Sequence, residues 1–334
     1  MGRTRPPVLV TRRLPQQALD QIVARCDMTL YDGAGAMPRD RLLTEVAGMA
    51  GAITLLTDRV DEQFLDAAGP RLTVVANCAV GFDNMDLDAC TRHGVLACNT
   101  PGVLTETTAD AAFALMMAAA RRVAEGDRFV RSGTGWIWGP LMMLGQDIHH
   151  ATLGIVGFGR IGQALARRAR GFSMRVLYHD TVRPPAEVEQ ELAAQYRDLE
   201  DLLGESDFVS VHVSLTPQTR HLINARRLAM MKPTAVLVNT SRGPVIDEQA
   251  LAQALRQGQI FAAGLDVFER EPEVHPGLLA CDNAVLIPHL GSATVTTRLA
   301  MANLAVDNLL AGLEDRRPPA LLNLAAWEHR TPPG

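Results

Sequence analysis

The sequence has few cysteines, and neither sign of charge dominates it. Five cysteines occur among 334 residues, an odd number without a Cys-x-x-Cys pair: Cys26, Cys78, Cys90, Cys98 and Cys281. This usage argues against a disulfide framework and against a zinc site, so we expect free thiols and no bound metal. The formal net charge is −5 and the arginines are scattered, so we expect no nucleic-acid partner.

Long apolar runs are also missing. The most apolar stretch, residues 111–120, is ten residues long, about half of a membrane span, and it predicts a buried core helix. The apolar run after the basic N-terminus is too short for a signal peptide. We therefore expect no membrane partner and a cytoplasmic location, and the chain length suits two domains.

A complete β-turn-α-β pattern lies between residues 151 and 180. Residues 153–156 are typical of a short buried strand, and Gly157, Gly159 and Gly162 follow it as a Gly-x-Gly-x-x-Gly motif. A helix and a second strand, residues 174–178, complete the unit. Because all these elements are in place, the pattern favours a dinucleotide-binding site over a glycine-rich turn of some other α/β protein.

The three glycines and the acid after the second strand have separate tasks in such a site. Gly157 permits the tight turn, Gly159 lets a pyrophosphate approach the backbone, and Gly162 lets the helix pack closely on the sheet. The helix N-terminus offers N–H groups and a positive dipole to the phosphates. Asp180 ends the second strand. Its carboxylate can accept hydrogen bonds from both ribose hydroxyls and would repel a 2′-phosphate.

Short apolar runs alternate with helical segments along the whole chain, which predicts parallel sheets covered on both faces. We therefore predict an α/β fold of two Rossmann-like, doubly wound domains. Residues 99–102 break the pattern, and one long helix is expected over residues 105–131. The first domain lacks a closing element, so we expect the C-terminal tail to return to it. The predicted domains are residues 1–101 with 291–334, and residues 102–290.

The segment from residue 132 to residue 147 is rich in glycine but carries Trp136 and Trp138. An apolar loop of this kind is usually buried against another surface. From the residues alone, packing on its own chain and packing on a partner subunit remain equal alternatives.

Three strand ends of the second predicted domain carry groups suited to one reaction. Arg242, Glu271 and His289 follow successive apolar runs, and ligands of open α/β sheets bind beyond the carboxyl ends of the strands. Hydride transfer to a ketone needs an imidazole to protonate the alkoxide and a carboxylate to orient that imidazole. A guanidinium can pair with a substrate carboxylate and polarise the adjacent carbonyl. Each residue alone is more often structural, but together they match this set.

The chain resembles the D-isomer-specific 2-hydroxyacid dehydrogenases over nearly its whole length, most closely the glyoxylate/hydroxypyruvate reductase branch. The resemblance implies two Rossmann-like domains of the formate/glycerate dehydrogenase type. The motifs that carry it occur in order: NCAVGFDNMD (77–86), NTPGVLTETTAD (99–110), LGIVGFGRIG (153–162), SDFVSVHVSLTPQT (206–219), VLVNTSRGPVIDE (236–248), GLDVFEREP (264–272) and PHLGSAT (288–294).

This resemblance implies a role for each matching residue. The catalytic set would be His289 as acid/base, Glu271 as its orienting partner, and Arg242 on the carboxylate and carbonyl of the substrate. The substrate site would consist of Leu56, Val80, Gly81, Arg242 and Trp138. The cofactor would be held by Thr108, Gly157, Phe158, Gly159, Arg160, Ile161, Gly162, Asp180, Val213, Thr219, Thr240, Asp266 and Gly291.

Cofactor choice and subunit arrangement follow from two of these positions. Asp180 opposes a 2′-phosphate, whereas Arg183, three residues later, would favour one. An unpaired carboxylate facing a phosphate costs more than an exposed arginine gains, so we predict that NADH is preferred and NADPH tolerated. In similar reductases the tryptophan loop closes the active site of the other subunit. Trp138 matches that position, which implies a homodimer.

The predicted function is NAD(P)H-dependent reduction of a small 2-oxo acid, glyoxylate or hydroxypyruvate, to the D-2-hydroxy acid. A 2-ketogluconate-type reductase is the alternative within the same class. A phosphite-type dehydrogenase and an NAD(H)-sensing corepressor on the same fold remain open, because both can carry Arg242, Glu271 and His289.

Overall fold

The chain folds into two compact units, each described by itself below. A computed structural model describes residues 5–330. Unit 1 consists of residues 1–104 and 294–334, and unit 2 of residues 105–293. Both observed boundaries lie three residues beyond the predicted ones. Residues 1–4 and 331–334, which the prediction assigned to the first domain, lie outside the described part.

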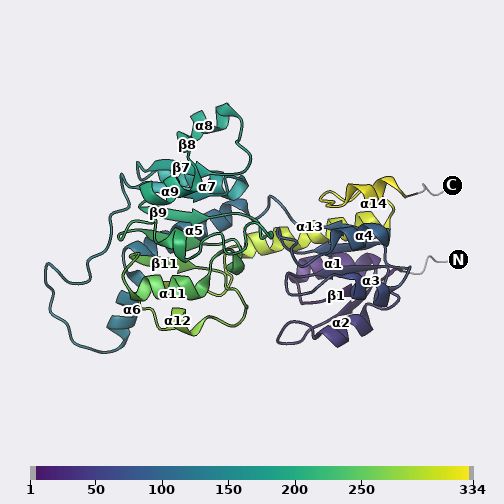
Figure 1. The fold of residues 1–334 in the computed structure, drawn as a ribbon. Coiled ribbons are helices and arrows are strands. Elements are labelled where there is room, and N and C mark those ends of the chain that lie inside the picture. Colours follow the sequence, from purple (N-terminus) through teal and green to yellow (C-terminus); the bar gives the residue numbers. More distant parts are fainter. Residues whose placement is uncertain (1–4, 331–334) are drawn as a thin grey trace. The chain divides into compact units, whose positions relative to one another are not determined.

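Unit 1 is built on a five-stranded parallel sheet in the order β2-β1-β3-β4-β5 (Figure 1). This is the 2-1-3-4-5 order of a doubly wound fold. Residues of β3, β4 and β5 are fully buried, as expected for a parallel sheet with helices on both faces. The strands are β1 (Pro7–Val10), β2 (Asp27–Leu30), β3 (Gly51–Thr54), β4 (Val74–Asn77) and β5 (Leu96–Cys98), and the helices between them are α1 (Gln16–Arg25), α2 (Arg39–Glu45), α3 (Glu62–Ala68) and α4 (Leu87–Arg92).

The C-terminal segment completes unit 1. Helix α13 (Val295–Leu313) packs on β3 and β4. Their approach is close, because a Cβ on Gly312 would lie 2.7 Å from the Cβ of Val74. After it, the Asn323 side chain accepts a hydrogen bond from the Ala97 N–H at 2.9 Å and donates one to the Val95 carbonyl at 2.9 Å. The short helix α14 (Leu324–Glu328) follows.

Unit 2 is built on a seven-stranded parallel sheet in the order β12-β11-β10-β9-β6-β7-β8. The chain starts in the middle at β6, winds outward to β8, and returns to β9 on the other side of β6. The two halves therefore diverge between β6 and β9, which is where such folds bind ligands. The predicted doubly wound α/β fold is confirmed. The strands are β6 (Thr152–Val156), β7 (Arg175–His179), β8 (Ala194–Tyr196), β9 (Phe208–Val211), β10 (Val236–Asn239), β11 (Ala262–Leu265) and β12 (Ala284–Leu286).

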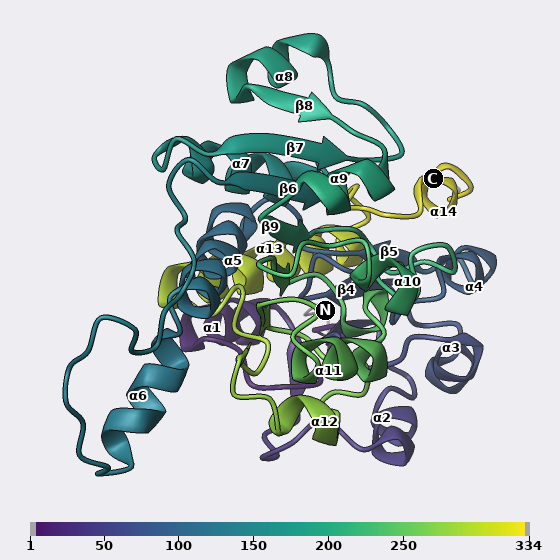
Figure 2. The same cartoon turned by 60° about the vertical axis from the view of Figure 1, so that its left-hand side comes forward.

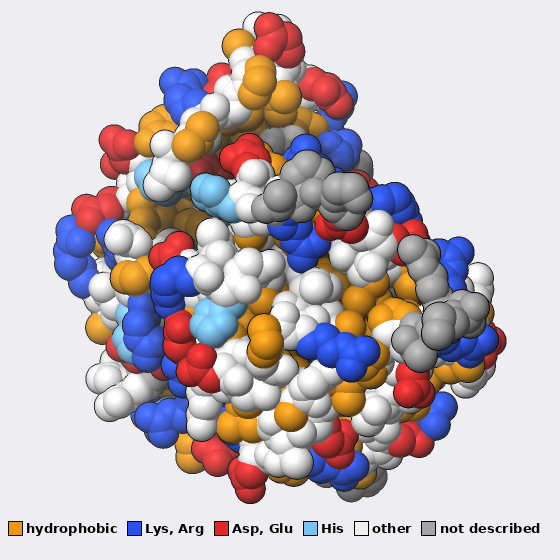
Figure 3. Space-filling model, turned by 90° about the vertical axis from the view of Figure 1, so that its right-hand side faces the viewer, with side chains coloured by type: hydrophobic (Ala, Val, Ile, Leu, Met, Phe, Trp, Pro, Cys, Tyr) orange, Lys and Arg blue, Asp and Glu red, His pale blue; other side chains and the backbone are white. Residues whose placement is uncertain are grey.

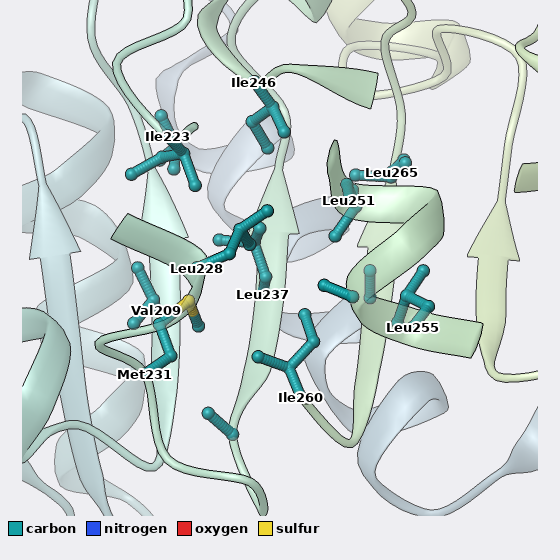
Figure 4. Packing of buried hydrophobic residues seen from close by; sticks show 14 of the residues in the cluster. Val209, Ile223, Leu228, Met231, Leu237, Ile246, Leu251, Leu255, Ile260 and Leu265 are labelled. Carbon is teal, nitrogen blue, oxygen red and sulfur yellow. The ribbon is translucent and has the colours of Figure 1, made fainter. Parts of the chain in front are cut away.

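Helices cover both faces of this sheet. On one face, apolar side chains from β9, β10 and β11 meet those of α10 and α11, as the close view in Figure 4 shows. On the other face, α5 packs over β10 and β11, and α7 packs over β6 and β7. The helices of unit 2 are α5 (Thr105–Ala120), α6 (Val123–Arg131), α7 (Arg160–Arg170), α8 (Ala186–Leu192), α9 (Leu199–Glu205), α10 (Ala225–Leu228), the 3₁₀ turn η1 (Gly243–Val245), α11 (Glu248–Arg256) and α12 (Pro276–Leu279).

The single helix expected over residues 105–131 is wrong, because the chain forms two helices there. Arg122, between α5 and α6, has φ 52°, a left-handed conformation that ends a helix. The chain that returns after α6 stabilises this end. Gln146 N–H donates to the Ala120 carbonyl at 2.9 Å, which is one of the last carbonyls of α5 and lacks a helical partner.

Helix α6 and the loop after it form an arm, residues 123–145, that extends away from the sheet of unit 2 (Figures 1 and 2). No residue of α6 is buried. In the loop, Trp136 is 56% exposed, Ile137 94% and Trp138 75%. These three side chains are therefore not buried by packing within unit 2.

Charged side chains of both signs are interspersed on the face shown in Figure 3, in keeping with the small net charge of −5. Within residues 5–330, no helix combines the length and the apolar character needed to cross a membrane.

Leu237 allows a test of the core in Figure 4. It lies in the middle of β10 and is completely buried, so Leu237→Ala should lower the free energy of unfolding by about 2–5 kcal/mol. Urea unfolding followed by circular dichroism measures this. Leu279→Ala, at a position that is 66% exposed, is the control and should change stability by less than about 0.5 kcal/mol. Equal effects of both changes would contradict this view of the core.

Candidate active site

Glycine is required at one position of the turn after β6 and at one position in the first turn of α7. Gly157 has φ +95°, and a Cβ there would lie 2.7 Å from the backbone carbon of His212. A Cβ on Gly162 would lie 2.3 Å from the Gly157 oxygen. By contrast, a Cβ on Gly159 would meet no atom within 4 Å. The turn is therefore tightly packed on its protein side and open at Gly159, where α7 begins.

The start of α7 has the properties of a phosphate site. Gly159 is the N-cap residue and provides no side-chain hydrogen bond to the helix. The first N–H groups of α7, from Arg160 and Ile161, have no partner within the helix and carry its positive dipole. They can bind an anion without competition from a capping side chain.

Asp180 lies directly after β7 and contacts the glycine turn. Its Oδ2 accepts a hydrogen bond from the Phe158 N–H at 2.6 Å, and its Oδ1 accepts one from the Val182 N–H at 3.3 Å. The Phe158 N–H is thus not available to a pyrophosphate. The ring of Phe158 stacks on Tyr178 with centroids 4.2 Å apart. A carboxylate has about four acceptor sites, so Asp180 retains capacity for ribose hydroxyls.

These features fit a nicotinamide dinucleotide. Besides the open position at Gly159, the Thr240 hydroxyl after β10 is buried and has no hydrogen-bond partner, as expected for a group that a bound ligand would satisfy. Val213 follows β9, close to Gly157. The Thr219 hydroxyl donates to the Ser214 carbonyl at 2.6 Å and so holds the loop after β9 closed.

Asn239, the last residue of β10, positions Arg242. Its Oδ1 accepts hydrogen bonds from the Ser241 N–H at 3.0 Å and the Ser241 hydroxyl at 2.8 Å, and its Nδ2 donates to the Arg242 carbonyl at 2.9 Å. Gly243, which follows Arg242, lies very close to the loop after β11. A Cβ on Gly243 would lie 1.9 Å from the backbone carbon of Phe268. The turn that carries Arg242 is therefore held against the loop that carries Glu271.

Asp266 ties that loop to the turn after β12. The residue is 1% exposed, and its carboxylate accepts hydrogen bonds from the Leu290 N–H at 2.5 Å and the Gly291 N–H at 2.8 Å. Its own carbonyl accepts from the His289 N–H at 2.8 Å. Burial raises the pKa of Asp266 against the opposing effect of these N–H groups. Thr108, on α5, lies beside the same turn, close to Gly291.

His289 and Glu271 form the charged pair of the site. His289 Nδ1 lies 2.9 Å from Glu271 Oε2, and Glu271 Oε1 accepts from the Phe268 N–H at 3.0 Å. Burial alone would raise the pKa of Glu271, but the hydrogen bond and charge of His289 and the guanidinium of Arg242 lower it overall. An ionised carboxylate only accepts hydrogen bonds, so Nδ1 carries a proton. This leaves Nε2 as the nitrogen that can exchange a proton with a ligand.

The other predicted substrate residues lie on three segments, two in unit 1 and one in unit 2. In unit 1, the loop after β4 is fixed by side-chain amides: Asn99 donates to the Val80 carbonyl at 2.7 Å and Asn77 to the Gly81 carbonyl at 3.1 Å. Leu56, 37% exposed, lies in the loop after β3. Trp138 belongs to the arm of unit 2. By contrast, the hydrogen bonds and close backbone contacts described above connect five of the predicted residues within unit 2: Arg242, Glu271, His289, Asp266 and Gly291.

Sequence reasoning missed several residues that position the site. Asn239 could have been found, because an asparagine at a strand end typically hydrogen-bonds the backbone two residues later in an Asx turn. In unit 1, the Asn84 amide donates to the carbonyls of Leu55 and Asp58 at 3.0 and 2.8 Å, and Asp58 accepts from the Leu55 N–H at 2.8 Å. No local signal in the sequence identifies this clamp on the loop that carries Leu56.

His212 is a further missed residue, directly under the glycine turn. Its N–H donates to the Val156 carbonyl at 2.7 Å, and its Nε2 lies 2.8 Å from the Ser210 hydroxyl. Burial lowers the pKa of His212 to about 4. The imidazole is therefore neutral at neutral pH and adds no charge to the point where the two halves of the sheet diverge.

This pKa predicts a contribution to acid sensitivity. Since His212 binds a proton more readily in the unfolded chain, its contribution to stability is present above pH 6.5 and is lost as the pH falls toward 4. Between pH 6.5 and pH 5, the free energy of unfolding of the wild type should fall by about 1.5 kcal/mol more than that of His212→Gln. Urea unfolding at both pH values measures the difference, and parallel losses in both proteins would refute it.

Comparison with known proteins gives consistent matches. Residues 113–291 match the family profile described as D-isomer specific 2-hydroxyacid dehydrogenase, NAD binding domain. A glyoxylate reductase of Thermococcus onnurineus is 49% identical over 332 residues, which cover 98% of this chain and 99% of the relative. A crystal structure of a Thermus thermophilus protein is 46% identical, with a TM-score of 0.89 and coverage of 95% of this chain and 99% of that one.

A third match bears on the cofactor. The structure of an NADPH-dependent glyoxylate/hydroxypyruvate reductase from Sinorhizobium meliloti, in complex with NADP and malonate, is 31% identical. It has a TM-score of 0.83 and covers 98% of this chain and 100% of that chain.

Proposed function

Because the chain belongs to the D-isomer-specific 2-hydroxyacid dehydrogenase family, and is thus an oxidoreductase acting on a CH–OH group, we propose that it reduces glyoxylate or hydroxypyruvate to the D-2-hydroxy acid. The observation that carries the proposal is the His289–Glu271 pair at 2.9 Å. It lies at the same edge of the sheet as Arg242 and the glycine turn. Curated relatives of nearly equal length are glyoxylate reductases.

His289 is the acid in the direction of reduction. Its Nε2–H donates a proton to the carbonyl oxygen of the substrate as that oxygen gains negative charge. Glu271 does not touch the substrate. It acts as a positioning residue that accepts the Nδ1–H and stabilises the imidazolium before the proton leaves.

Arg242 binds the carboxylate of the 2-oxo acid. A guanidinium can donate two parallel hydrogen bonds to a carboxylate, which fixes the orientation of the substrate as well as its place. Another N–H of the same group polarises the carbonyl. The Asn239 amide keeps the backbone of this turn in place through the Arg242 carbonyl, so the side chain starts from a fixed point.

A reduced nicotinamide, when bound, would supply the hydride for the carbonyl carbon. The residues of this chain would hold it: the Arg160 and Ile161 N–H groups would bind the pyrophosphate, and the Thr240 hydroxyl would gain a partner. Asp180 accepts hydrogen bonds from the ribose hydroxyls and disfavours a 2′-phosphate. On this ground we infer a preference for NADH, unlike the NADPH-dependent relative from Sinorhizobium meliloti.

We propose further that the protein is a homodimer held together by the arm. The arm exposes Trp136, Ile137, Trp138 and Leu141, and contiguous apolar side chains of this kind are typical of protein interfaces. A second copy of the chain is the occupant that covers them, and Trp138 then contributes to the substrate site of the partner subunit.

Turnover with defined substrates tests the function. The purified protein should oxidise NADH in the presence of glyoxylate or hydroxypyruvate, and more slowly with pyruvate. His289→Gln should lower kcat by about 10²–10⁴-fold, because the proton donor is lost, with the Kd for NADH unchanged in a fluorescence titration. His149→Gln, at an exposed histidine of unit 2, is the control and should keep full activity.

Other outcomes of this assay would change the assignment. Activity confined to 2-ketogluconate, or NAD reduction with phosphite, would replace the substrate. Tight NADH binding without turnover of any of these compounds would favour a sensor. Unchanged kcat in His289→Gln would remove this histidine from the chemistry.

The dimer can be tested with charge substitutions at matched exposed positions. Ile137→Asp places a carboxylate on the arm at a side chain that is 94% exposed, so it should convert the dimer into a monomer in light scattering after size-exclusion chromatography. Val182→Asp, at a side chain that is 76% exposed and outside the arm, should leave the dimer intact. A monomeric wild type, or a dimeric Ile137→Asp variant, would contradict the proposal.

A further inference from the structure

The arginine three residues after Asp180 is held by a carboxylate. Arg183 follows β7 by four residues, and its Nη2 and Nε donate to Glu189 Oε1 at 2.7 and 3.2 Å. The same Glu189 oxygen accepts a hydrogen bond from the Tyr178 hydroxyl of β7. Glu189 belongs to α8, so three segments meet at one carboxylate.

An aromatic ring contributes a second contact to the same guanidinium. The Arg183 Cζ lies 5.1 Å from the ring centroid of Tyr196, in β8, a distance at which a cation is attracted to the face of the ring. The Arg183 side chain remains 60% exposed, whereas that of Glu189 is only 20% exposed. The carboxylate is thus the fixed member of the pair, and the arginine is the exposed one.

We propose that Glu189 is a specificity-determining residue that keeps Arg183 from serving as a receptor for the 2′-phosphate of NADPH. This inference rests on the proposed use of a nicotinamide dinucleotide bound at Asp180. The preference for NADH then has two components. Asp180 repels the 2′-phosphate directly, and Glu189 keeps the Arg183 guanidinium from binding it.

Two physical effects of Glu189 act in the same direction. It occupies two N–H groups of the guanidinium, which are the groups that bind phosphate oxygens. It also cancels the charge of Arg183, so the potential at the end of β7 is determined by Asp180. An arginine released from Glu189 would have both its donors and its charge available to a phosphate.

The ion pair with Glu189 explains why the sequence position of Arg183 alone gives the wrong expectation for coenzyme preference. A basic residue shortly after the second strand is expected to favour NADP over NAD. Here its carboxylate partner comes six residues later, on a helix that begins after two prolines, Pro184 and Pro185. The charge near the ribose site is therefore regulated from α8.

Coenzyme binding by Glu189→Gln tests the inference. Glutamine keeps an oxygen to accept from Tyr178 but lacks the charge that holds Arg183. The ratio of the Kd for NADPH to the Kd for NADH, measured by fluorescence titration, should fall by about tenfold. Glu187→Gln removes an exposed carboxylate from the same helix and is the matched control, so it should leave the ratio nearly unchanged.

Arg183→Ala separates the proposed mechanism from a general charge effect. In the wild-type background it should barely change the ratio, because the guanidinium is already withheld. In the Glu189→Gln background it should restore the wild-type ratio. An unchanged ratio in Glu189→Gln, or a tenfold fall that survives Arg183→Ala, would overturn the inference.

The same titrations distinguish this inference from the proposed function. If neither coenzyme binds to the wild type, the assignment of the dinucleotide site fails. If NADH binds more tightly than NADPH and Asp180→Ala reduces the difference while Glu189→Gln does not, the site assignment stands and only the role of Glu189 is refuted.

Discussion

The position of the histidine depends on one buried carboxylate. Asp266 is only 1% exposed. Its two carboxylate oxygens accept hydrogen bonds from the N–H groups of Leu290 and Gly291, the two residues after His289. Its backbone also joins its neighbours: the Asp266 N–H donates to the Asn239 carbonyl at 3.0 Å. Three strand ends are thereby connected through a single residue. A buried carboxylate is costly unless its oxygens are hydrogen-bonded, and the backbone N–H groups of the turn after β12 provide these hydrogen bonds.

Two carboxylates in this small region have pKa values displaced in opposite directions. Burial dominates at Asp266 and raises its pKa, whereas His289 and Arg242 outweigh burial at Glu271 and lower its pKa. The difference separates their tasks. Asp266 faces backbone N–H groups and holds the loop, while Glu271 faces the imidazole and remains its anionic partner. The surroundings of these two carboxylates thus give one of them a structural role and the other a role in the chemistry.

The sequence predicts the buried strands well and the local exceptions poorly. Apolar runs identify the strands around the glycine motif because parallel strands are buried on both faces. β8 and α8 were missed, since each is short and is stabilised by its neighbours rather than by its own pattern: β8 pairs with β7, and α8 packs on α7 and β8. The break at Arg122 was missed for a related reason. The hydrogen bond to the Ala120 carbonyl comes from Gln146, and a contact across twenty-six residues leaves no periodic signal.

The charged residues of the site illustrate the same limit. Strand ends predict which side chains reach one edge of a sheet, and this was sufficient to bring Arg242, Glu271 and His289 together. Charge balance, however, depends on partners that no spacing rule identifies. Asp180 and Arg183 look opposed in the sequence, yet the structure gives each a separate partner, the Phe158 N–H for one and Glu189 for the other. The electrostatic potential at a nucleotide site therefore has to be derived from its ion pairs and hydrogen bonds. Counting the charged residues near the site would include charges, such as that of Arg183, that a partner already neutralises.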